Sequence, residues 1–523
     1  MQKNKLTLNI KKLTSSILKF DFEKQIRILA IKNIHNIKLF FIIFAIVIIV
    51  YGNNIFFYHL SNDDYFRFYN GGLEQASNLG RWMATIFNHY IFSGSIHVLP
   101  YINGVIGLFS ITLASFITAK FWNRTNNIEV AIITLLIATT PFFARNFFFH
   151  TNISLWITTL FGIIGLVLAY RRTKLFTLLG LILLIISIGS YQTIVQVTIA
   201  IVFFKTIFDI LDVNSSKEIK EVLFRAFYLI SFIFVAFAIS TYINHLYLDY
   251  YDLAAQIRYK RFENIEPLVV YINRIIKMYS YLLNSNFKLF YFVNEILFFY
   301  KLIAILGVFA TYIIILKKDI STKTKMIYIS LFTLLFALVP IIINLVFITG
   351  NGIPNRSHYT IGWIIAGFFI LQRMAFKDLF KTITFTLSII VIIINIYYMN
   401  VFFDAMNRQT NSDITRANQI VNRIRMHNNY TSEPIKFKII GVKTFPVIGW
   451  HHRIQAFNSK RSKYKIFEIF TDLKFTKMTN KEYDDMFNNL AKSNYSLEEY
   501  PAKNSIIVQG NNVVLFLNLS KKK

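Results

Sequence analysis

Apolar runs long enough to cross a lipid bilayer recur along most of this chain, and they constrain its fold more than any other feature. About 20 helical residues cross the hydrocarbon core of a bilayer. Hydrophobic residues make up 55% of the 523 residues, and the mean hydropathy is +0.47, so we predict a polytopic α-helical membrane protein. About eleven transmembrane helices are expected, at residues 38–60, 100–120, 128–144, 152–170, 175–190, 192–211, 226–246, 293–316, 326–349, 357–373 and 382–403.

The distribution of basic residues predicts which loops face which side of the membrane. Residues 1–38 carry nine Lys or Arg and two acids, so the positive-inside rule places this end in the cytoplasm. We therefore predict a cytoplasmic basic segment at 1–37 and a transmembrane domain at 38–403. The loops at 121–127, 171–174, 212–225, 317–325 and 372–381 then fall inside, and nearly all of them carry several Lys or Arg. The loops at 61–99, 145–151, 247–292 and 350–356 fall outside, with the tail from 404.

The outer loop 247–292 is an exception, because it is itself rich in Lys, Arg and Tyr. The favoured interpretation is one or two amphipathic helices that lie in the membrane interface with their basic flanks on headgroups. The alternative is a basic lid over an anionic substrate.

The long apolar runs stop at residue 404, and a mixed sequence follows. A polar helical start at 404–426 precedes short strand-like runs. The last of these, SIIVQGNNVVLFLNL, predicts a β-hairpin with its turn at Gly510, Asn511 and Asn512. We therefore predict a small external α/β domain at 404–523.

Composition and missing motifs exclude several classes of function. The net charge of +29 lies mostly between apolar runs, which indicates membrane topology and anionic lipid contact and not nucleic-acid binding. With no cysteine, the chain has no disulfide and no thiolate metal site. Motifs for phosphate-binding loops, zinc proteases, nucleophile elbows and dinucleotide binding are absent from the sequence.

The first external loop, 61–99, opens with two adjacent carboxylates and an arginine. In Asn62-Asp63-Asp64-x-x-Arg67, Asp64 and Arg67 share one face of a helix. Carboxylates at a membrane boundary are costly unless they are paired or hydrated, which makes a functional role the first hypothesis. Either acid can act as a general base toward a sugar hydroxyl, or the pair can bind a divalent cation such as Mg²⁺ or Mn²⁺. The structural alternative is a helix N-cap with Arg67 as a surface partner.

Four arginines are predicted on the outer side, where the positive-inside rule disfavours basic residues. They are Arg67, Arg81, Arg145 and Arg356. Arginine binds phosphate bidentately, so four arginines beside an acid pair indicate a pocket for an anionic group such as phosphate. The alternative is that they are interface anchors whose charged ends reach the lipid headgroups.

Three further polar side chains fall on the same side of the membrane. His150 follows the third span, and Tyr191 and Gln192 interrupt an otherwise apolar run. Polar groups at such a break are tolerated only against protein or a water-filled cavity. All three are candidate pocket residues, and for His150 a structural hydrogen-bonding role is the alternative.

With these motifs the chain resembles the Gtr-type serotype-converting O-antigen glucosyltransferases and, more broadly, the polytopic GT-C glycosyltransferases. The resemblance covers most of residues 40–400. It is carried by the Asn62–Arg67 motif with Gly72, by Asn78-Leu79-Gly80-Arg81-Trp82, by the Ser190-Tyr191-Gln192 break and by the Gly352-x-Pro354-x-Arg356 turn.

The resemblance implies a GT-C-like membrane domain that moves a sugar, glucose by analogy with the family, from a polyprenyl (undecaprenyl) phosphate. The acceptor would be a lipopolysaccharide O-antigen or related surface glycan at the periplasmic face of a bacterial inner membrane. Asp63 or Asp64 would be the base, Arg67 and Arg81 would hold the leaving phosphate, and Arg356 is a weaker phosphate candidate. Membrane lipid is the remaining expected partner, and the need for a divalent cation stays open. The rival functions are a flippase or transporter of a lipid-linked or anionic solute, and a surface-glycan polymerase or ligase.

Overall fold

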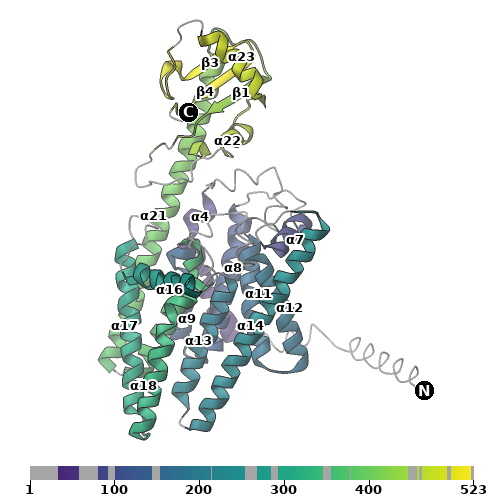
Figure 1. The fold of residues 1–523 in the computed structure, drawn as a ribbon. Helices are drawn as coiled ribbons and strands as arrows, with labels where there is room; N and C mark the ends of the chain where they lie inside the picture. The colour runs from purple at the N-terminus through teal and green to yellow at the C-terminus, as the bar shows by residue number, and fades with distance from the viewer. Residues whose placement is uncertain are drawn as a thin grey trace, which may run out of the picture.

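The computed structural model describes the chain in fourteen stretches. They are residues 33–57, 60, 80–91, 100–143, 153–213, 215–253, 268–283, 293–345, 355–376, 378–443, 445, 456–458, 462–491 and 496–519. Within them, a large bundle of helices is joined to a small domain that contains the sheet (Figure 1).

Most helices of the bundle stand roughly parallel to one another (Figure 1). In chain order the described elements up to the link helix are α3 (Ile34–Val50), α4 (Gly52–Phe56), α7 (Trp82–Ile91), α8 (Pro100–Phe121), α9 (Asn127–Ala138), α11 (Ile153–Tyr170), α12 (Lys174–Ser190), α13 (Ile194–Asp212), α14 (Ser216–Tyr250), α16 (Leu268–Leu283), α17 (Val293–Lys317), α18 (Thr322–Ala337), α19 (Val339–Asn344), η3 (Asn355–Thr360) and α20 (Ile361–Ala375).

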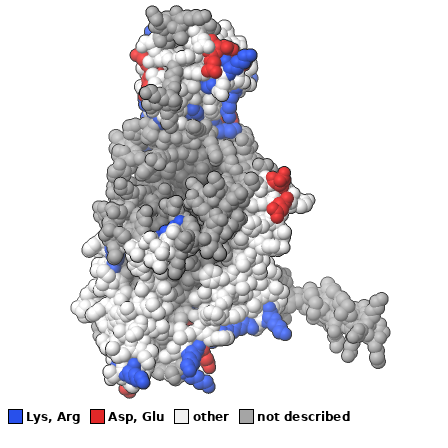
Figure 2. All heavy atoms as spheres, viewed as in Figure 1, with Lys and Arg blue, Asp and Glu red and all other residues white. Residues whose placement is uncertain are grey.

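Apolar side chains cover the outside of the bundle as well as its interior. Ile49 is 78% exposed, and large apolar side chains of α14, α17 and α18 are also strongly exposed. A surface of this kind is expected in lipid and not in water. Figure 2 shows a broad uncharged band over the bundle, with Lys and Arg gathered at the end that lies away from the C-terminal domain.

Six described helices are long and apolar enough to cross a membrane, which confirms a polytopic helical membrane protein. They are Tyr101–Phe121, Ile194–Asp212, Lys217–Tyr250, Ile296–Lys317, Thr322–Ile343 and Leu379–Arg425. Shorter apolar helices also fall on predicted spans, at Ile34–Val50, Asn127–Phe143, Ser154–Tyr170 and Lys174–Ser190. The total of eleven spans stays a prediction.

Glycines hold α11 and α12 close together. A Cβ on Gly165 would lie 2.8 Å from the carbonyl oxygen of Gly180, and one on Gly180 would lie 2.6 Å from that of Gly165. Small residues at a helix crossing allow such close approach of the two backbones. The Ser187 hydroxyl also donates to the Thr158 carbonyl oxygen at 2.5 Å. These contacts hold α12 against α11 at Gly180 and at Ser187, three residues before α12 ends at Ser190.

One helix links the bundle to the C-terminal domain. This helix, α21 (Asp378–Arg425), has 48 residues and is roughly 72 Å long at ~1.5 Å per residue, whereas the core of a bilayer is only ~30 Å thick. Its apolar first part therefore belongs to the bundle, and its polar part rises from the bundle to the C-terminal domain (Figure 1). The sequence predicts a span that ends at 403 and a polar helical start at 404–426, and the structure joins the two in one unbroken helix. Asp404 and Arg408 form an i,i+4 ion pair just after residue 403.

The C-terminal domain is built on a four-stranded sheet with the order β2-β1-β4-β3. β1 is parallel to β2 and β4, and β3 is antiparallel to β4, which confirms the predicted hairpin. Its elements are β1 (Ile435–Ile440), η4 (Ala456–Asn458), α22 (Ser462–Phe470), β2 (Phe475–Lys477), α23 (Asn480–Ala491), η5 (Lys503–Ser505), β3 (Ile506–Gln509) and β4 (Asn512–Phe516).

The two faces of this sheet are covered by different helices. Side chains alternate between the faces of a strand, and in β4 Val513 and Leu515 enter one apolar core while Val514 and Phe516 enter another. The first core includes residues of α21 and α22, and the second includes Met486 of α23. The polar end of α21 is therefore part of the domain that it carries.

The predicted amphipathic loop contains α16, which lies across the bundle in Figure 1. Val269, Ile272 and Ile276 are exposed on it at helical spacing, which forms an apolar stripe. An amphipathic helix in this loop is thus confirmed. Its position in the membrane interface stays a prediction.

Candidate active site

The middle of the first external loop, at residues 80 and 81, is attached to the break between α12 and α13. The Arg81 guanidinium lies over the Tyr191 ring, with Cζ 4.3 Å from the ring centroid. Next to it, the Gln192 side-chain amide donates to the Gly80 carbonyl oxygen at 2.8 Å. Gly80 has a φ of +78°, which favours glycine. Three predicted site residues, Arg81, Tyr191 and Gln192, are therefore brought together from two distant parts of the chain.

Trp82, next to Arg81 in the chain, contacts both α12 and α14 and so holds this part of the loop in place. Its indole Nε1 donates to the Ser240 hydroxyl of α14 at 3.1 Å. Its ring lies directly against Gly189 of α12, where a Cβ would come within 2.5 Å of Trp82 Cε2. Only glycine leaves room for the ring at this distance, so Gly189 helps to set the position of the neighbouring Arg81.

The backbone between α12 and α13 leaves the helical conformation at the polar residues. Tyr191 has extended dihedral angles, with φ −159° and ψ 116°, and α13 begins at Ile194. The Thr193 hydroxyl in this break hydrogen-bonds the Tyr359 hydroxyl at 2.7 Å. The break thus joins this part of the first external loop to η3.

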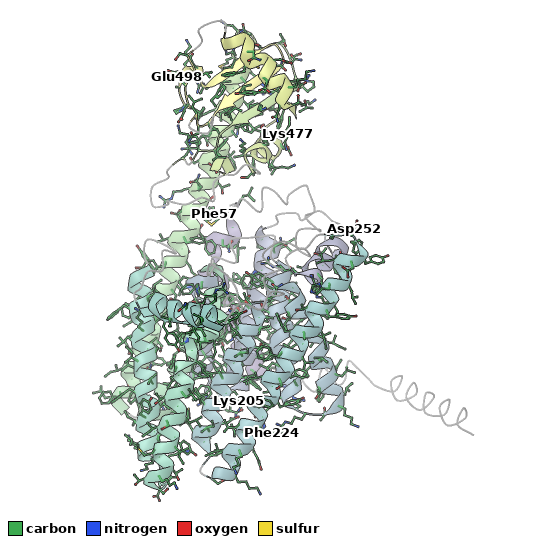
Figure 3. All side chains as sticks on the ribbon, viewed as in Figure 1. Phe57, Lys205, Phe224, Asp252, Lys477 and Glu498 are labelled. Atoms are coloured by element: carbon green, nitrogen blue, oxygen red, sulfur yellow. The ribbon has the colours of Figure 1, made fainter. Side chains whose placement is uncertain are left out.

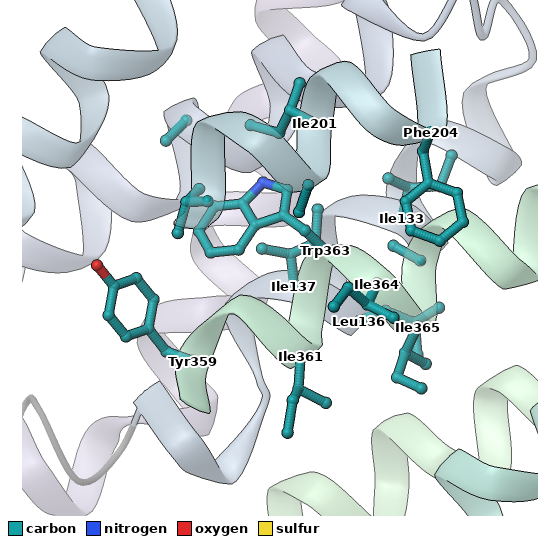
Figure 4. Close-up of a cluster of buried hydrophobic side chains, with 14 of the residues drawn as sticks. Ile133, Leu136, Ile137, Ile201, Phe204, Tyr359, Ile361, Trp363, Ile364 and Ile365 are labelled. Atoms are coloured by element: carbon teal, nitrogen blue, oxygen red, sulfur yellow. The ribbon is translucent and has the colours of Figure 1, made fainter. Parts of the chain in front are cut away.

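The turn before α20 and the end of the third predicted span meet beside this break. The Phe143 and Tyr359 ring centroids are 5.2 Å apart, and those of Phe142 and His358 are 6.0 Å apart. Figure 4 shows Tyr359 at the edge of the apolar cluster around Trp363, with its hydroxyl directed away from that cluster. Four of the segments singled out in the sequence therefore converge at one end of the bundle.

A cavity of about 410 Å³ is lined in part by Gly80 and Gln192. Its wall is largely apolar, and a few polar side chains come from α14 and from the break. The lining residues are Gly80, Ile188, Gln192, Phe237, Ala238, Ser240, Thr241, Tyr242 and His245. A mostly apolar cavity with a few convergent polar groups is the usual form of a ligand site.

The α14 residues of this cavity were missed by the sequence analysis. Ser240, Thr241 and His245 fall in or at the end of the predicted span 226–246, which was interpreted only as an apolar helix. A signal was present, because Thr241 and His245 are four residues apart and so share a helix face. Polar side chains on one face of a membrane helix indicate a cavity or a partner helix.

The remaining predicted site residues are not described at the side-chain level. Asp63, Asp64, Arg67, Arg145 and His150 lie outside the described residues. The backbone of Arg356 belongs to η3, but its side chain is outside the description too. Their roles stay predictions.

Metal binding cannot be assigned to the described part of the chain. Among the described residues, no group of three or more His, Asp or Glu side chains is arranged to hold a metal ion. The acid pair, for which cation binding is one of the two roles considered, lies outside them. The need for a divalent cation therefore stays open.

Comparison with known proteins identifies the family. A family model described as Glucosyl transferase GtrII matches residues 52–372, which is more than half of the chain and includes every segment that converges at the site. The comparisons with curated proteins and with solved structures found no match. The match confirms the resemblance stated from the sequence, and the chain belongs to the glucosyl transferase GtrII family and is a membrane glycosyltransferase.

Proposed function

We propose that the protein transfers a sugar, glucose by family analogy, from a polyprenyl-phosphate-sugar to an O-antigen or related surface glycan. The reaction would take place at the periplasmic face of a bacterial inner membrane. The observation that carries this proposal is the Arg81 guanidinium held over Tyr191, one residue from Gly80 at the wall of a largely apolar cavity. A fixed cation beside an apolar cavity suits a donor whose phosphate is attached to a hydrocarbon chain.

The charge change of the reaction explains why an arginine is needed. When an acceptor hydroxyl oxygen attacks the anomeric carbon, the bond from that carbon to the phosphate oxygen breaks, and the lipid phosphate leaves as an anion. A preorganised cation stabilises the charge that develops in the transition state. Arg81 is already oriented by stacking, so it loses little freedom when the phosphate binds. Arg67 and Arg356 are proposed as further phosphate ligands.

The proton of the acceptor hydroxyl needs a base. Asp63 and Asp64 are the proposed candidates, and Arg145, His150, Tyr191 and Gln192 are proposed pocket residues. If the reaction needs Mg²⁺ or Mn²⁺, the same acid pair offers the oxygen ligands that these ions prefer.

The charge distribution supports the proposed sidedness. Lys and Arg gather at the end of the bundle that lies away from the C-terminal domain (Figure 2), and basic loops favour the cytoplasmic side. This supports a periplasmic position for the opposite end, which carries Arg81 and the C-terminal domain.

Transfer by the purified full chain in lipid nanodiscs tests the proposal. The assay supplies a synthetic polyprenyl-phosphate-glucose with a purified O-antigen glycan and measures the glycosylated product. We expect product from the wild type and a large loss in Arg81→Gln. Separate Asp63→Asn and Asp64→Asn variants test the base, and full activity in both would remove these acids from the mechanism. If the donor moved across the bilayer of proteoliposomes and no glycosylated product formed, the protein would be a flippase instead.

A further inference from the structure

The chain enters the external segment 61–79 through a residue that is buried in the C-terminal domain. Leu60 is only 3% exposed and belongs to the same apolar core as Ala417 of α21 and Phe457 of η4. Its backbone N–H donates to the Thr410 hydroxyl of α21 at 3.0 Å. Leu60 is therefore held by the helix that carries the C-terminal domain, although 350 residues separate it from Thr410.

One turn further along the same helix, a second set of hydrogen bonds attaches α21 to the C-terminal domain. Asp413 is buried, and its Oδ2 accepts a hydrogen bond from the Ala456 backbone N–H at 2.9 Å. Its Oδ1 accepts from the Gln409 amide, also at 2.9 Å. Residues 410 and 413 lie three apart and so face the same side of the helix. We name Leu60, Gln409, Thr410, Asp413 and Ala456 the α21 joint.

Cationic and aromatic groups support the joint from the side of the domain. The Arg416 Nη1 atom is 4.0 Å from Asp413 Oδ1, and its guanidinium lies over the Phe445 ring at 4.3 Å. A buried carboxylate with hydrogen bonds and a nearby cation is compensated for the loss of water. The Asp413 carboxylate is thus satisfied within a domain core, whereas the buried Arg416 Nη1 atom has no hydrogen-bond partner among the described residues.

The far end of the same external segment is attached to the bundle. Gly80 accepts from Gln192, and Arg81 stacks on Tyr191. At the near end, α21 is itself tied to α3, because the Asn400 amide donates to the Val50 carbonyl oxygen at 3.1 Å. The segment that carries the proposed base therefore starts at the C-terminal domain and ends at the proposed phosphate site.

We propose that Thr410 and Asp413 are positioning residues for sugar transfer. Thr410 holds the start of the 61–79 segment through Leu60, and Asp413 holds the C-terminal domain on the same helix through Ala456, so that the C-terminal domain sets the geometry of the reaction. This inference rests on the proposed function. The residues touch neither donor nor acceptor, so their loss lowers kcat and leaves the KM for the donor near the wild-type value.

Conservative substitutions in the full chain test the joint. Thr410→Val keeps the shape of the side chain and removes the acceptor, and we expect kcat to fall about 10-fold to 100-fold, as for a small misplacement of a catalytic group. Thr410→Ser retains the hydroxyl and is expected to restore activity. Asp413→Ala is expected to act like Thr410→Val, and Asp413→Asn, which still accepts from Ala456, is expected to keep most of the activity. The matched control is Thr134→Val, because the Thr134 hydroxyl donates to the Val130 carbonyl of its own helix.

Spin labels report on the joint without any need for catalysis. The chain has no cysteine, so labels attach only to introduced Cys at Phe57 and Met426, which are 52% and 82% exposed. Phe57 lies at the end of the bundle beside α21 (Figure 3). We expect one narrow distance distribution between the two labels in the wild type and in Thr134→Val. Thr410→Val is expected to broaden it.

The kinetic measurement and the distance measurement together distinguish failure of the joint from failure of the proposed function. A narrow distribution in Thr410→Val, or a broad one with unchanged kcat, would overturn the joint as a positioning device. A broad distribution with lowered kcat and rescue by Thr410→Ser supports it. If the wild type transfers no sugar, the proposed function fails, and an unbroadened distribution in Thr410→Val would then reject the joint as well.

Discussion

Replacing Gly189 with Ala perturbs the contact that holds Trp82, and through it the neighbouring Arg81. The new Cβ would lie 2.5 Å from Trp82 Cε2. Carbon atoms pack best at ~3.5–4.0 Å, so the indole ring must retreat by about 1 Å. Overpacking of this kind costs about 1–3 kcal/mol, and the better helix propensity of Ala returns up to about 1 kcal/mol. The protein is therefore expected to fold, with Arg81 displaced.

A displacement of about 1 Å in a group that stabilises the transition state can lower the rate about 100-fold. We therefore expect Gly189→Ala to lower kcat/KM by one to two orders of magnitude in the nanodisc transfer assay, with a thermal midpoint close to that of the wild type. The matched control is Gly52→Ala, because a Cβ there would be 3.7 Å from the nearest atom, Phe56 Cδ2. Equal activity in the two variants would refute the argument that Trp82 positions Arg81.

Three further predictions concern single contacts. Arg81→Lys keeps the charge but loses the planar group that stacks and binds phosphate bidentately, so kcat/KM should fall about 10-fold or more in the transfer assay. Thr193→Val leaves the buried Tyr359 hydroxyl without this partner and should destabilise the protein by about 1–3 kcal/mol, whereas adding Tyr359→Phe should recover most of that loss in denaturant titrations. A hydrogen bond from Lys436 at 2.6 Å, with others from Thr479, lowers the pKa of Glu482 to about 2. The stability that this pair adds is present above pH about 4.5 and is lost toward pH 2, so Lys436→Gln should reduce the loss of thermal stability on acidification.

Each of these predictions has a matched control and a contrary outcome. Arg171→Lys changes a basic residue at the opposite end of the bundle, and an equal loss of activity there would show a general effect of the substitution. Thr134→Val removes a hydroxyl that bonds only within its own helix in the described contacts, and a loss of stability as large as that of Thr193→Val would contradict the role given to the Thr193–Tyr359 hydrogen bond. Lys481→Gln changes an exposed lysine of α23, and a pH profile that it shares with the Lys436 variant would contradict the assignment to Glu482.

Sequence reasoning reached the convergence at the site because membrane topology restricts where loops can go. Once the spans are counted, Arg81, the Tyr191 break and the turn before α20 must all emerge at one end of the bundle. The Arg81–Tyr191 contact and the Gln192–Gly80 hydrogen bond agree with that expectation. Counting the spans does not show which residues of these loops contact one another, because the topology rule places every loop at that end equally well.

Two other features were beyond a search for apolar runs. Such a search detects the point where hydrophobicity changes, and it therefore divided the last span, ending at 403, from the polar helical start at 404–426, although the two form one helix from Asp378 to Arg425. The same search gave no weight to Ser240 and His245 within an apolar stretch, although both line the cavity. In both cases, whether a segment forms a helix and whether that helix lies in lipid, protein or water are separate properties. Hydropathy reports only on the second of these.

The contact between Leu60 and Thr410 was even less predictable from the sequence. Neither residue belongs to a motif, their separation in the chain is 350 residues, and one lies in a segment that looked like the end of a span. Their meeting depends on α21 being long enough to leave the membrane and rigid enough to bring its polar part over the first external loop. Because the helix continues past 403, the C-terminal domain contacts the start of the segment that carries the acid pair. A domain that the sequence presents as a separate tail is therefore joined to the proposed reaction centre, and changes in either are expected to affect both.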